Sequence, residues 1–170
     1  MKKIIISLLI TSSLFASEQQ AVQAIQKTAM ALKKELQAAM KVSPVNAVSV
    51  CNTKAMPITK KFHEDGVEVG RVSLKNRNPN NTVKGWMNDT IMSYESGKNK
   101  KKYSVVRIDS DKNGIIMPIK TMPLCLNCHG DNLKPEVQSK ITQLYPSDKA
   151  TGYKSGDIRG YFWATFKANK

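Results

Sequence analysis

The sequence is short of the residues that build metal clusters and nucleophilic active sites, with only 3 cysteines and 2 histidines in 170 residues. A zinc knuckle needs a second pair of ligands at matching spacing, and only Cys51 and His63 remain outside the single Cys-x-x-Cys-His motif. One stretch, 109–120, begins like a calcium-binding loop but ends in Lys120, where a bidentate acid is required. No nucleophile stands beside a base in a recognisable pattern, so we do not expect an enzyme.

Long apolar runs are also missing, apart from one near the N-terminus that is too short to cross a membrane. A charged start, the apolar residues 4–14 and the small Ala16 together have the pattern of an export signal. With no repeat or low-complexity tract elsewhere, we expect a signal peptide at 1–16, a single domain at 17–170 and a periplasmic location. Leu14 is larger than the residue usually found at this distance from a cleavage site, which leaves open that the segment is kept as an anchor.

Cys125, Cys128 and His129 form the motif Cys-x-x-Cys-His. Two thiols at this spacing can form thioethers with the vinyl groups of a haem, and the adjacent imidazole can bind the iron as its proximal ligand. The alternatives are a thiol redox pair and, in an oxidising compartment, a disulfide between the two cysteines. Because the histidine stands directly beside the pair, we predict one covalently bound haem c per chain.

Basic residues outnumber acidic ones, with 27 Lys and Arg against 13 Asp and Glu and a formal net charge of +14. Such a surface attracts acidic redox partner proteins or the anionic head groups of a membrane. The same charge is also typical of a lysine-rich, well-solvated surface that has no partner. Nucleic acid is not expected as a partner, because the chain has no basic helix and no interleaving of aromatic and basic residues.

The first part of the predicted domain has the apolar periodicity of helices. One stripe recurs at steps of three and four along residues 17–41, where Ser17 can open a capping box. A stripe this long packs either on its own domain or on a second copy of the chain, as a homodimer. Ser43 and Pro44 predict the start of a short helix, and residues 54–64 predict a further one.

Beyond residue 66 the apolar pattern becomes typical of strands. Strands are predicted at 67–75, 103–108, 115–122 and 158–166, the middle two paired as a hairpin around 109–114. Further helices are predicted near 86–97 and from Pro135 onward. Helices followed by strands with short helical insertions predict an α+β domain built on an antiparallel sheet.

Six ordered segments span nearly all of the predicted domain: AVSVC at 47–51, RVS at 71–73, RNPNN at 77–81, CLNCHG at 125–130, YPSDKATGY at 145–153 and GDIRG at 156–160. Together they resemble periplasmic monohaem c-type proteins with a PAS-like fold, first catalogued as a domain of unknown function. That family includes the haem sensor modules of some bacterial chemotaxis receptors. The resemblance implies a five-stranded PAS-like antiparallel sheet with flanking helices, and a haem bound by histidine and, in some members, by an upstream cysteine. Val83 departs from the acidic residue expected after the Asn-Pro loop.

Cys51 is an odd thiol in an exported protein once the two motif cysteines are used for thioethers. Taken with the resemblance, it is the first candidate for the sixth iron ligand, where a thiolate lowers the potential of a haem relative to methionine ligation. The other candidates are a methionine, of which Met122 is nearest to the motif, then His63, then an open or water-bound site. Cys51 can also be an inert core residue beside Val48.

Arg71, Arg77 and Arg159 can pair with haem propionates, since a guanidinium matches a carboxylate with two parallel hydrogen bonds. The alternative for each of them is ordinary surface charge. Arg71 and Arg77 are the candidates that we take forward for haem binding.

Two functions follow from a haem in such a domain. A change of iron redox state, or binding of a small gas, that alters the iron's ligation would make the protein a sensor with a signalling partner. The alternative is a soluble electron-transfer protein whose basic surface steers it to an acidic redox partner.

Overall fold

The computed structural model describes residues 6–63 and 66–168, with side chains from Glu18 onward. Its helices and strands are α1 (Ile6–Val42), α2 (Pro44–Lys60), β1 (Glu68–Val72), α3 (Asn88–Glu95), β2 (Ser104–Arg107), β3 (Lys112–Lys120), α4 (Leu126–His129), α5 (Pro135–Leu144) and β4 (Ile158–Lys167). Of the predicted signal peptide, residues 1–5 lie outside the described residues and 6–16 are helical backbone, so its cleavage stays a prediction. Among the described residues, no helix combines the length and the apolar character needed to cross a membrane.

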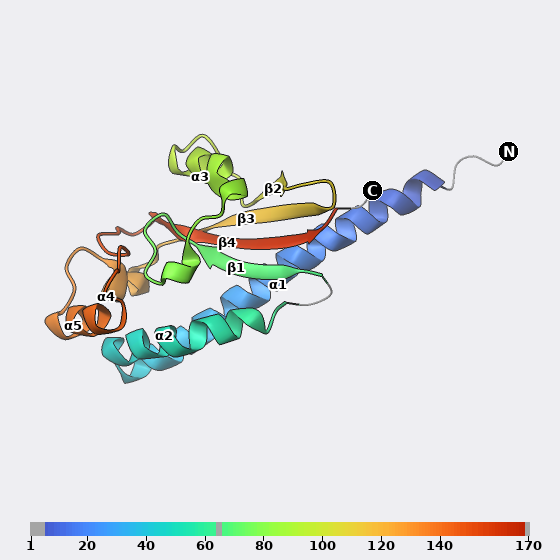
Figure 1. Ribbon diagram of the computed structural model, residues 1–170. Helices are drawn as coiled ribbons and strands as arrows, with labels where there is room; N and C mark the ends of the chain where they lie inside the picture. Colours follow the sequence, from blue (N-terminus) through green and yellow to red (C-terminus); the bar gives the residue numbers. More distant parts are fainter. Residues whose placement is uncertain (1–5, 64–65, 169–170) are drawn as a thin grey trace.

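The strands form one antiparallel sheet in the order β1-β4-β3-β2, with β4 and β3 in the middle (Figure 1). Helices flank this sheet, and a long N-terminal helix runs beneath it, so the predicted α+β fold with an antiparallel sheet is confirmed. The described part of the chain contributes four strands to the sheet, one fewer than the resemblance implied.

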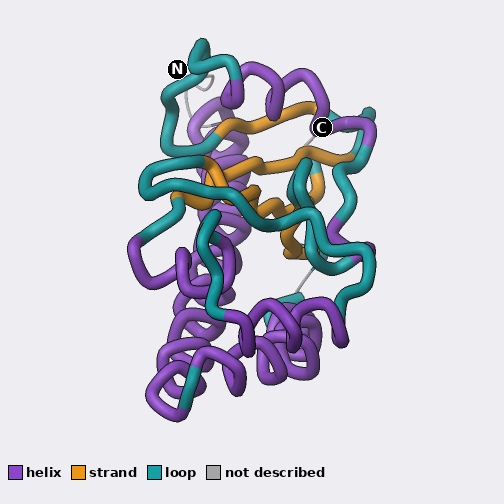
Figure 2. The backbone as a smooth tube through the Cα atoms, turned by 90° about the vertical axis from the view of Figure 1, so that its left-hand side faces the viewer, coloured by secondary structure: helices purple, strands orange, loops and turns teal. Residues whose placement is uncertain are grey.

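Different helices cover the two faces of the sheet (Figures 1 and 2). Successive side chains of a strand point to opposite faces, so Ala164 of β4 packs towards Ile25 of α1. Tyr161 and Trp163 of the same strand pack with Ile91 of α3 instead. Because apolar side chains line both of its faces, β4 is buried over most of its length.

A third apolar cluster joins α2 to α5 beyond the end of the sheet. Val48 of α2 packs there with Val137 and Ile141 of α5 and with Tyr145 just after it. The third cluster therefore holds α2 and α5 together, and both helices also contact the short helix α4.

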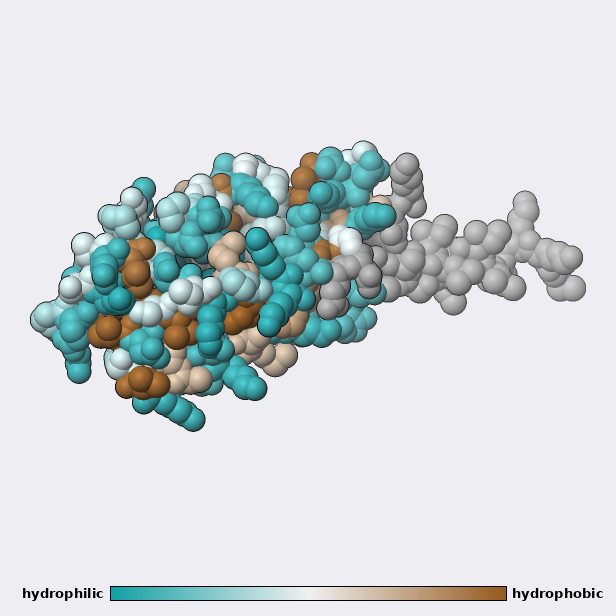
Figure 3. Space-filling model, turned by 60° about the horizontal axis from the view of Figure 1, so that its bottom comes forward, coloured by the Kyte–Doolittle hydropathy of each residue, from teal (hydrophilic) through white to brown (hydrophobic). Residues whose placement is uncertain are grey.

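The outer face of the α1–α2 pair is mostly hydrophilic, with apolar residues gathered along one band (Figure 3).

The helical predictions need two corrections. The helix α1 already begins at Ile6, so the capping box predicted at Ser17 is wrong. The two short helices predicted after residue 43 are a single helix, α2, which continues because Ala55 and Thr59 bury one face of its second half. The predicted N-cap is confirmed, since the hydroxyl of Ser43 accepts a hydrogen bond from the Asn46 amide at 3.0 Å. The apolar stripe of α1 packs on its own domain.

The predicted strands are confirmed, with shifted ends. The first ends at Val72, because the Ser73 amide donates to the Asn81 carbonyl at 3.0 Å and the chain leaves the sheet there. The hairpin pairs Ser104 with Ile116, and β3 begins three residues earlier than predicted because Lys112 is already paired with β4.

The fold predicts an unequal effect of alanine at two glycines. A Cβ on Gly70 would lie 2.4 Å from the Trp163 ring, whereas a Cβ on Gly85 meets nothing within 4 Å. We expect Gly70→Ala to lower the free energy of unfolding by about 1–3 kcal/mol through overpacking. Gly85→Ala is the matched control and should change it by less than about 0.5 kcal/mol. Urea unfolding measures both, and equal stabilities of the two variants would contradict this packing.

Candidate functional site

One cavity lies between the end of the sheet and the helices α1, α2 and α4. It holds about 1200 Å³ of atom-free space, part of it open to solvent. The structure brings to its wall the motif residues, the first candidate for the sixth iron ligand and the two arginines taken forward: Cys51, Arg71, Arg77, Cys125, Cys128 and His129. Arg159 lines it as well.

The Cys-x-x-Cys-His motif begins in a 3₁₀ turn, Pro123–Cys125, and continues into α4. Residues three apart on a helical turn share a face, so Cys125 and Cys128 both line the cavity as half-buried thiols. Burial raises the pKa of the Cys128 thiol, an effect that the positive charge of Arg77 opposes. Gly130 ends the helix, and a Cβ there would lie 2.7 Å from the Leu126 carbonyl oxygen.

His129 is held in one tautomer by a backbone carbonyl. Its Nδ1 lies 2.7 Å from the Ala150 oxygen, and because a carbonyl can only accept, Nδ1 carries the proton and Nε2 keeps its lone pair. Burial lowers the pKa of His129 well below its usual value, and the positive charges of Arg159 and Arg77 lower it further. The neutral ring with a free Nε2 is the form that binds a metal ion.

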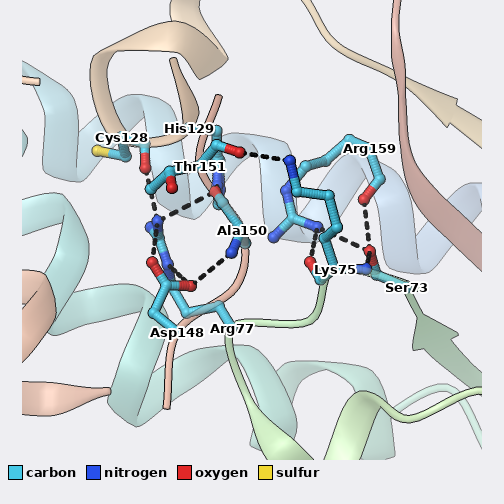
Figure 4. A network of polar contacts seen from close by, with 9 residues as sticks. All are labelled: Ser73, Lys75, Arg77, Cys128, His129, Asp148, Ala150, Thr151 and Arg159. Carbon is cyan, nitrogen blue, oxygen red and sulfur yellow. Dashed lines mark hydrogen bonds and ion pairs between the residues drawn. The ribbon is translucent and has the colours of Figure 1, made fainter. Parts of the chain in front are cut away.

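Arg77 forms a buried ion pair with Asp148, in which the two side chains are 10% and 9% exposed. Its Nε donates to Asp148 Oδ1 at 3.1 Å and its Nη2 to Oδ2 at 3.0 Å. The same Nη2 also contacts the carbonyls of Cys128 at 2.6 Å and Ala150 at 3.3 Å (Figure 4). Two of the three guanidinium nitrogens are therefore engaged within the protein.

Arg71 and Arg159 supply further positive charge at the cavity. The guanidinium of Arg71 makes no side-chain hydrogen bond to the described residues, and desolvation lowers its pKa. Arg159 donates from Nη1 to Ser73 Oγ at 3.3 Å, while its Nε is buried without a partner there. The three guanidinium groups, with Asp148 as the carboxylate paired to one of them, make the wall suited to an anionic ligand.

Cys51 reaches the cavity from α2. Its thiol is solvent-exposed because it faces the open cavity, in contrast to Val48 beside it, which is 3% exposed. Desolvation by the cavity walls raises the pKa of Cys51, and the nearby charges of Arg71 and Arg77 oppose this rise by favouring the thiolate. The thiol is thus open to a ligand in the cavity, unlike a core cysteine.

The other two candidate ligands do not reach this cavity. His63 Nε2 lies 2.8 Å from the Val69 carbonyl oxygen beside β1, and Met122 is 46% exposed outside the lining. Met40 of α1 lines the cavity instead, which sequence reasoning missed. Its position four residues after Leu36, on the same helix face, is the sequence pattern that could have identified it.

Within the described ranges, no three His, Cys, Asp or Glu side chains come together as a metal site.

Comparison with known proteins places the chain in a family. Residues 13–166 match the Tll0287-like family, described as Tll0287. The chain belongs to this family. The crystal structure of the cyanobacterial heme-protein Tll0287 has a similar fold, with a TM-score of 0.57 and 22% identity over 84% of this chain and 94% of that chain. No curated protein matches the sequence.

The environment of His129 predicts a pH dependence of folding. An unfolded histidine has a pKa of about 6.5, whereas the native pKa of His129 lies well below this value. Below about pH 6.5 the unfolded chain therefore binds a proton that the native state does not. The free energy of unfolding should decrease as the pH falls, by up to about 1.4 kcal/mol per pH unit. Urea unfolding of the cofactor-free protein between pH 5 and 7.5 measures this slope.

His129→Gln should flatten this slope, because the variant has no imidazole to protonate at that position. His63→Gln is the control and should retain it. Equal slopes for His129→Gln and the unaltered chain would mean that His129 titrates normally in the native state.

Proposed function

We propose that this protein is a periplasmic c-type haem protein that holds one haem in the cavity. Cys125 and Cys128 would form the thioethers, and His129 would bind the iron through Nε2. The observation that carries the proposal is that His129, with Nδ1 bonded to Ala150 and Nε2 free, shares one cavity with both cysteines. The similar fold of a cyanobacterial heme-protein supports it.

The charges and the lining of the cavity fit such a cofactor. A haem carries two propionate carboxylates, and Arg71 and Arg159 offer guanidinium donors that the described residues do not fully use. Apolar residues such as Val48, Leu124 and Ile119 line other parts of the wall. A bound haem would supply one-electron chemistry, and its iron could take a further ligand from the protein.

Cys51 is the proposed further ligand of the iron. It comes from α2 whereas His129 comes from α4, its thiol is open to the cavity, and two arginines oppose the rise in its pKa that burial causes. A thiolate bound to iron keeps the potential of a haem low relative to methionine ligation. Met40, the methionine of the lining, is the alternative donor.

The function that this arrangement supports best is sensing of redox state or of a small gas. Cys51 belongs to α2, whose Val48 packs against α5 and which also packs along α1. A change in what Cys51 binds would therefore change how these helices pack, which is the kind of local event that switches a domain. A haem whose iron took ligands from both His129 and Cys51 would offer no iron site to a substrate, so we propose that the protein is not an enzyme.

Electron transfer is the second candidate, favoured by the formal net charge of +14. A surface of this charge steers an acidic redox partner or an anionic membrane surface into contact. Fast one-electron exchange with little structural change would favour this role, and a slow change that depends on ligation would favour sensing.

Covalent attachment is the first test of the proposed function. Acid-acetone extraction of the denatured periplasmic protein should leave one haem per chain on the polypeptide, because thioethers survive this treatment. The double variant Cys125→Ala with Cys128→Ala should lose it. Recovery of free haem in the organic phase, or of stoichiometric zinc without iron, would overturn the proposal.

Replacement of Cys51 tests the axial ligand. Cys51→Ala should retain the covalent haem, since attachment depends on the other two cysteines, and should raise the reduction potential as the electron-rich thiolate is lost. Carbon monoxide or imidazole should bind more readily to the opened site. Ferric spectra, potentiometry and CO titration measure these changes.

Two methionine variants accompany this test. Met122→Leu lies outside the cavity lining and should match the unaltered protein in all three measurements, whereas a changed spectrum in Met40→Leu would assign the ligand to Met40. If Cys51→Ala behaves like Met122→Leu, Cys51 is not the ligand.

A further inference from the structure

The carbonyl oxygen of Ala150 accepts hydrogen bonds from two side chains of the cavity wall. His129 Nδ1 donates to it at 2.7 Å, and Arg77 Nη2 donates to it at 3.3 Å. These donors come from α4 and from the loop after β1, and Figure 4 shows them converging on Ala150. An acceptor that is shared between two donors binds each of them less strongly than it would bind one alone.

Arg77 is itself held in place by three other contacts. Asp148 binds its Nε and Nη2 as a fork, and Nη2 also donates to the Cys128 carbonyl at 2.6 Å. One guanidinium thus touches the backbone of the cysteine motif and the acceptor of the motif's histidine. Since this ion pair is about nine-tenths buried, its charges are weakly screened.

Ala150 does not depend on Arg77 for its position. The Ala150 amide donates to Asp148 Oδ1 at 2.9 Å. The next residues are paired with the motif itself, from the Gly152 amide to the Gly130 carbonyl and from the Tyr153 amide to the His129 carbonyl, each at 2.9 Å. We therefore expect the contact between His129 and Ala150 to survive replacement of Arg77. A change at His129 in such a variant would then come from the loss of the charge and the hydrogen-bond donor of Arg77.

We propose that Arg77 is a positioning residue that, through the Ala150 carbonyl, weakens the electron-donating power of His129, with Asp148 as its counter-charge. The proposal rests on the haem function proposed above. A histidine whose Nδ1–H donates more strongly becomes a more basic metal ligand and favours the oxidised metal. Arg77 competes for the carbonyl and adds positive charge nearby, so it favours the reduced state, and Asp148 opposes it.

The test is the reduction potential of the full-length haem-loaded protein. Arg77→Gln should lower the potential, and Asp148→Asn should raise it, each by on the order of a tenfold change in the reduction equilibrium, about 59 mV for one electron. Arg107→Gln removes the same charge from an exposed position on β2 and is the matched control, with no change expected. A merely structural role would shift the two buried variants in the same direction.

Arg77→Lys and a measurement without haem complete the test. The lysine keeps the charge but not the planar fork, so its potential should lie between those of the unaltered protein and Arg77→Gln. In the cofactor-free protein, the NMR resonance of the His129 Nδ1 proton should move downfield in Arg77→Gln, as its hydrogen bond strengthens. This measurement is independent of haem attachment in the variant.

The outcomes separate the two proposals. Absence of covalent haem from the unaltered protein overturns the proposed function and the role of Arg77 with it. If that haem is present but Arg77→Gln and Asp148→Asn share the potential of Arg107→Gln, or the Nδ1 resonance does not move, only the role of Arg77 is overturned.

Discussion

Hydrogen bonds between residues 148–153 and the Cys-x-x-Cys-His motif decide the geometry of the cavity. The motif helix is only four residues long, too short to be stable by itself. Its end is held by backbone bonds from Gly152 and Tyr153, and its histidine is held by the Ala150 carbonyl. The orientation of the Cys-x-x-Cys-His motif is thus set by a loop that follows it in the chain. Within that loop, Asp148 accepts a hydrogen bond from the Ala150 amide.

The sheet supplies the other fixed wall. The neighbouring strands β1 and β4 place Arg71 and Arg159 at the same end of the sheet. Gly160 permits this approach, since a Cβ there would lie 2.6 Å from the Val72 carbonyl oxygen. Burying several guanidinium groups is costly unless they are paired, and Arg77 alone has a carboxylate partner among the residues described. The remaining charge is what makes an anionic cofactor a good occupant of this cavity.

The local features of the fold could be predicted from the sequence. The Ser43 cap and the hairpin of β2 and β3 depend on residues close to one another in the chain. The errors arose where tertiary contacts decide. The helix α2 continues past its predicted break because its second half packs on the domain, and β3 begins early because β4 extends its pairing. Element ends of this kind depend on partners that periodicity does not reveal.

By itself the sequence determined the chemistry of the motif, because Cys125, Cys128 and His129 are close neighbours in the chain. Only the tertiary structure decided the surroundings of that motif. The acceptor of His129 lies 21 residues away and the partner of Arg77 71 residues away. The fold also brought Met40 to the cavity while leaving His63 outside it. The spacing of residues determines which side chains can lie together within a helical turn, whereas contacts between residues distant in the chain depend on how helices and sheet pack.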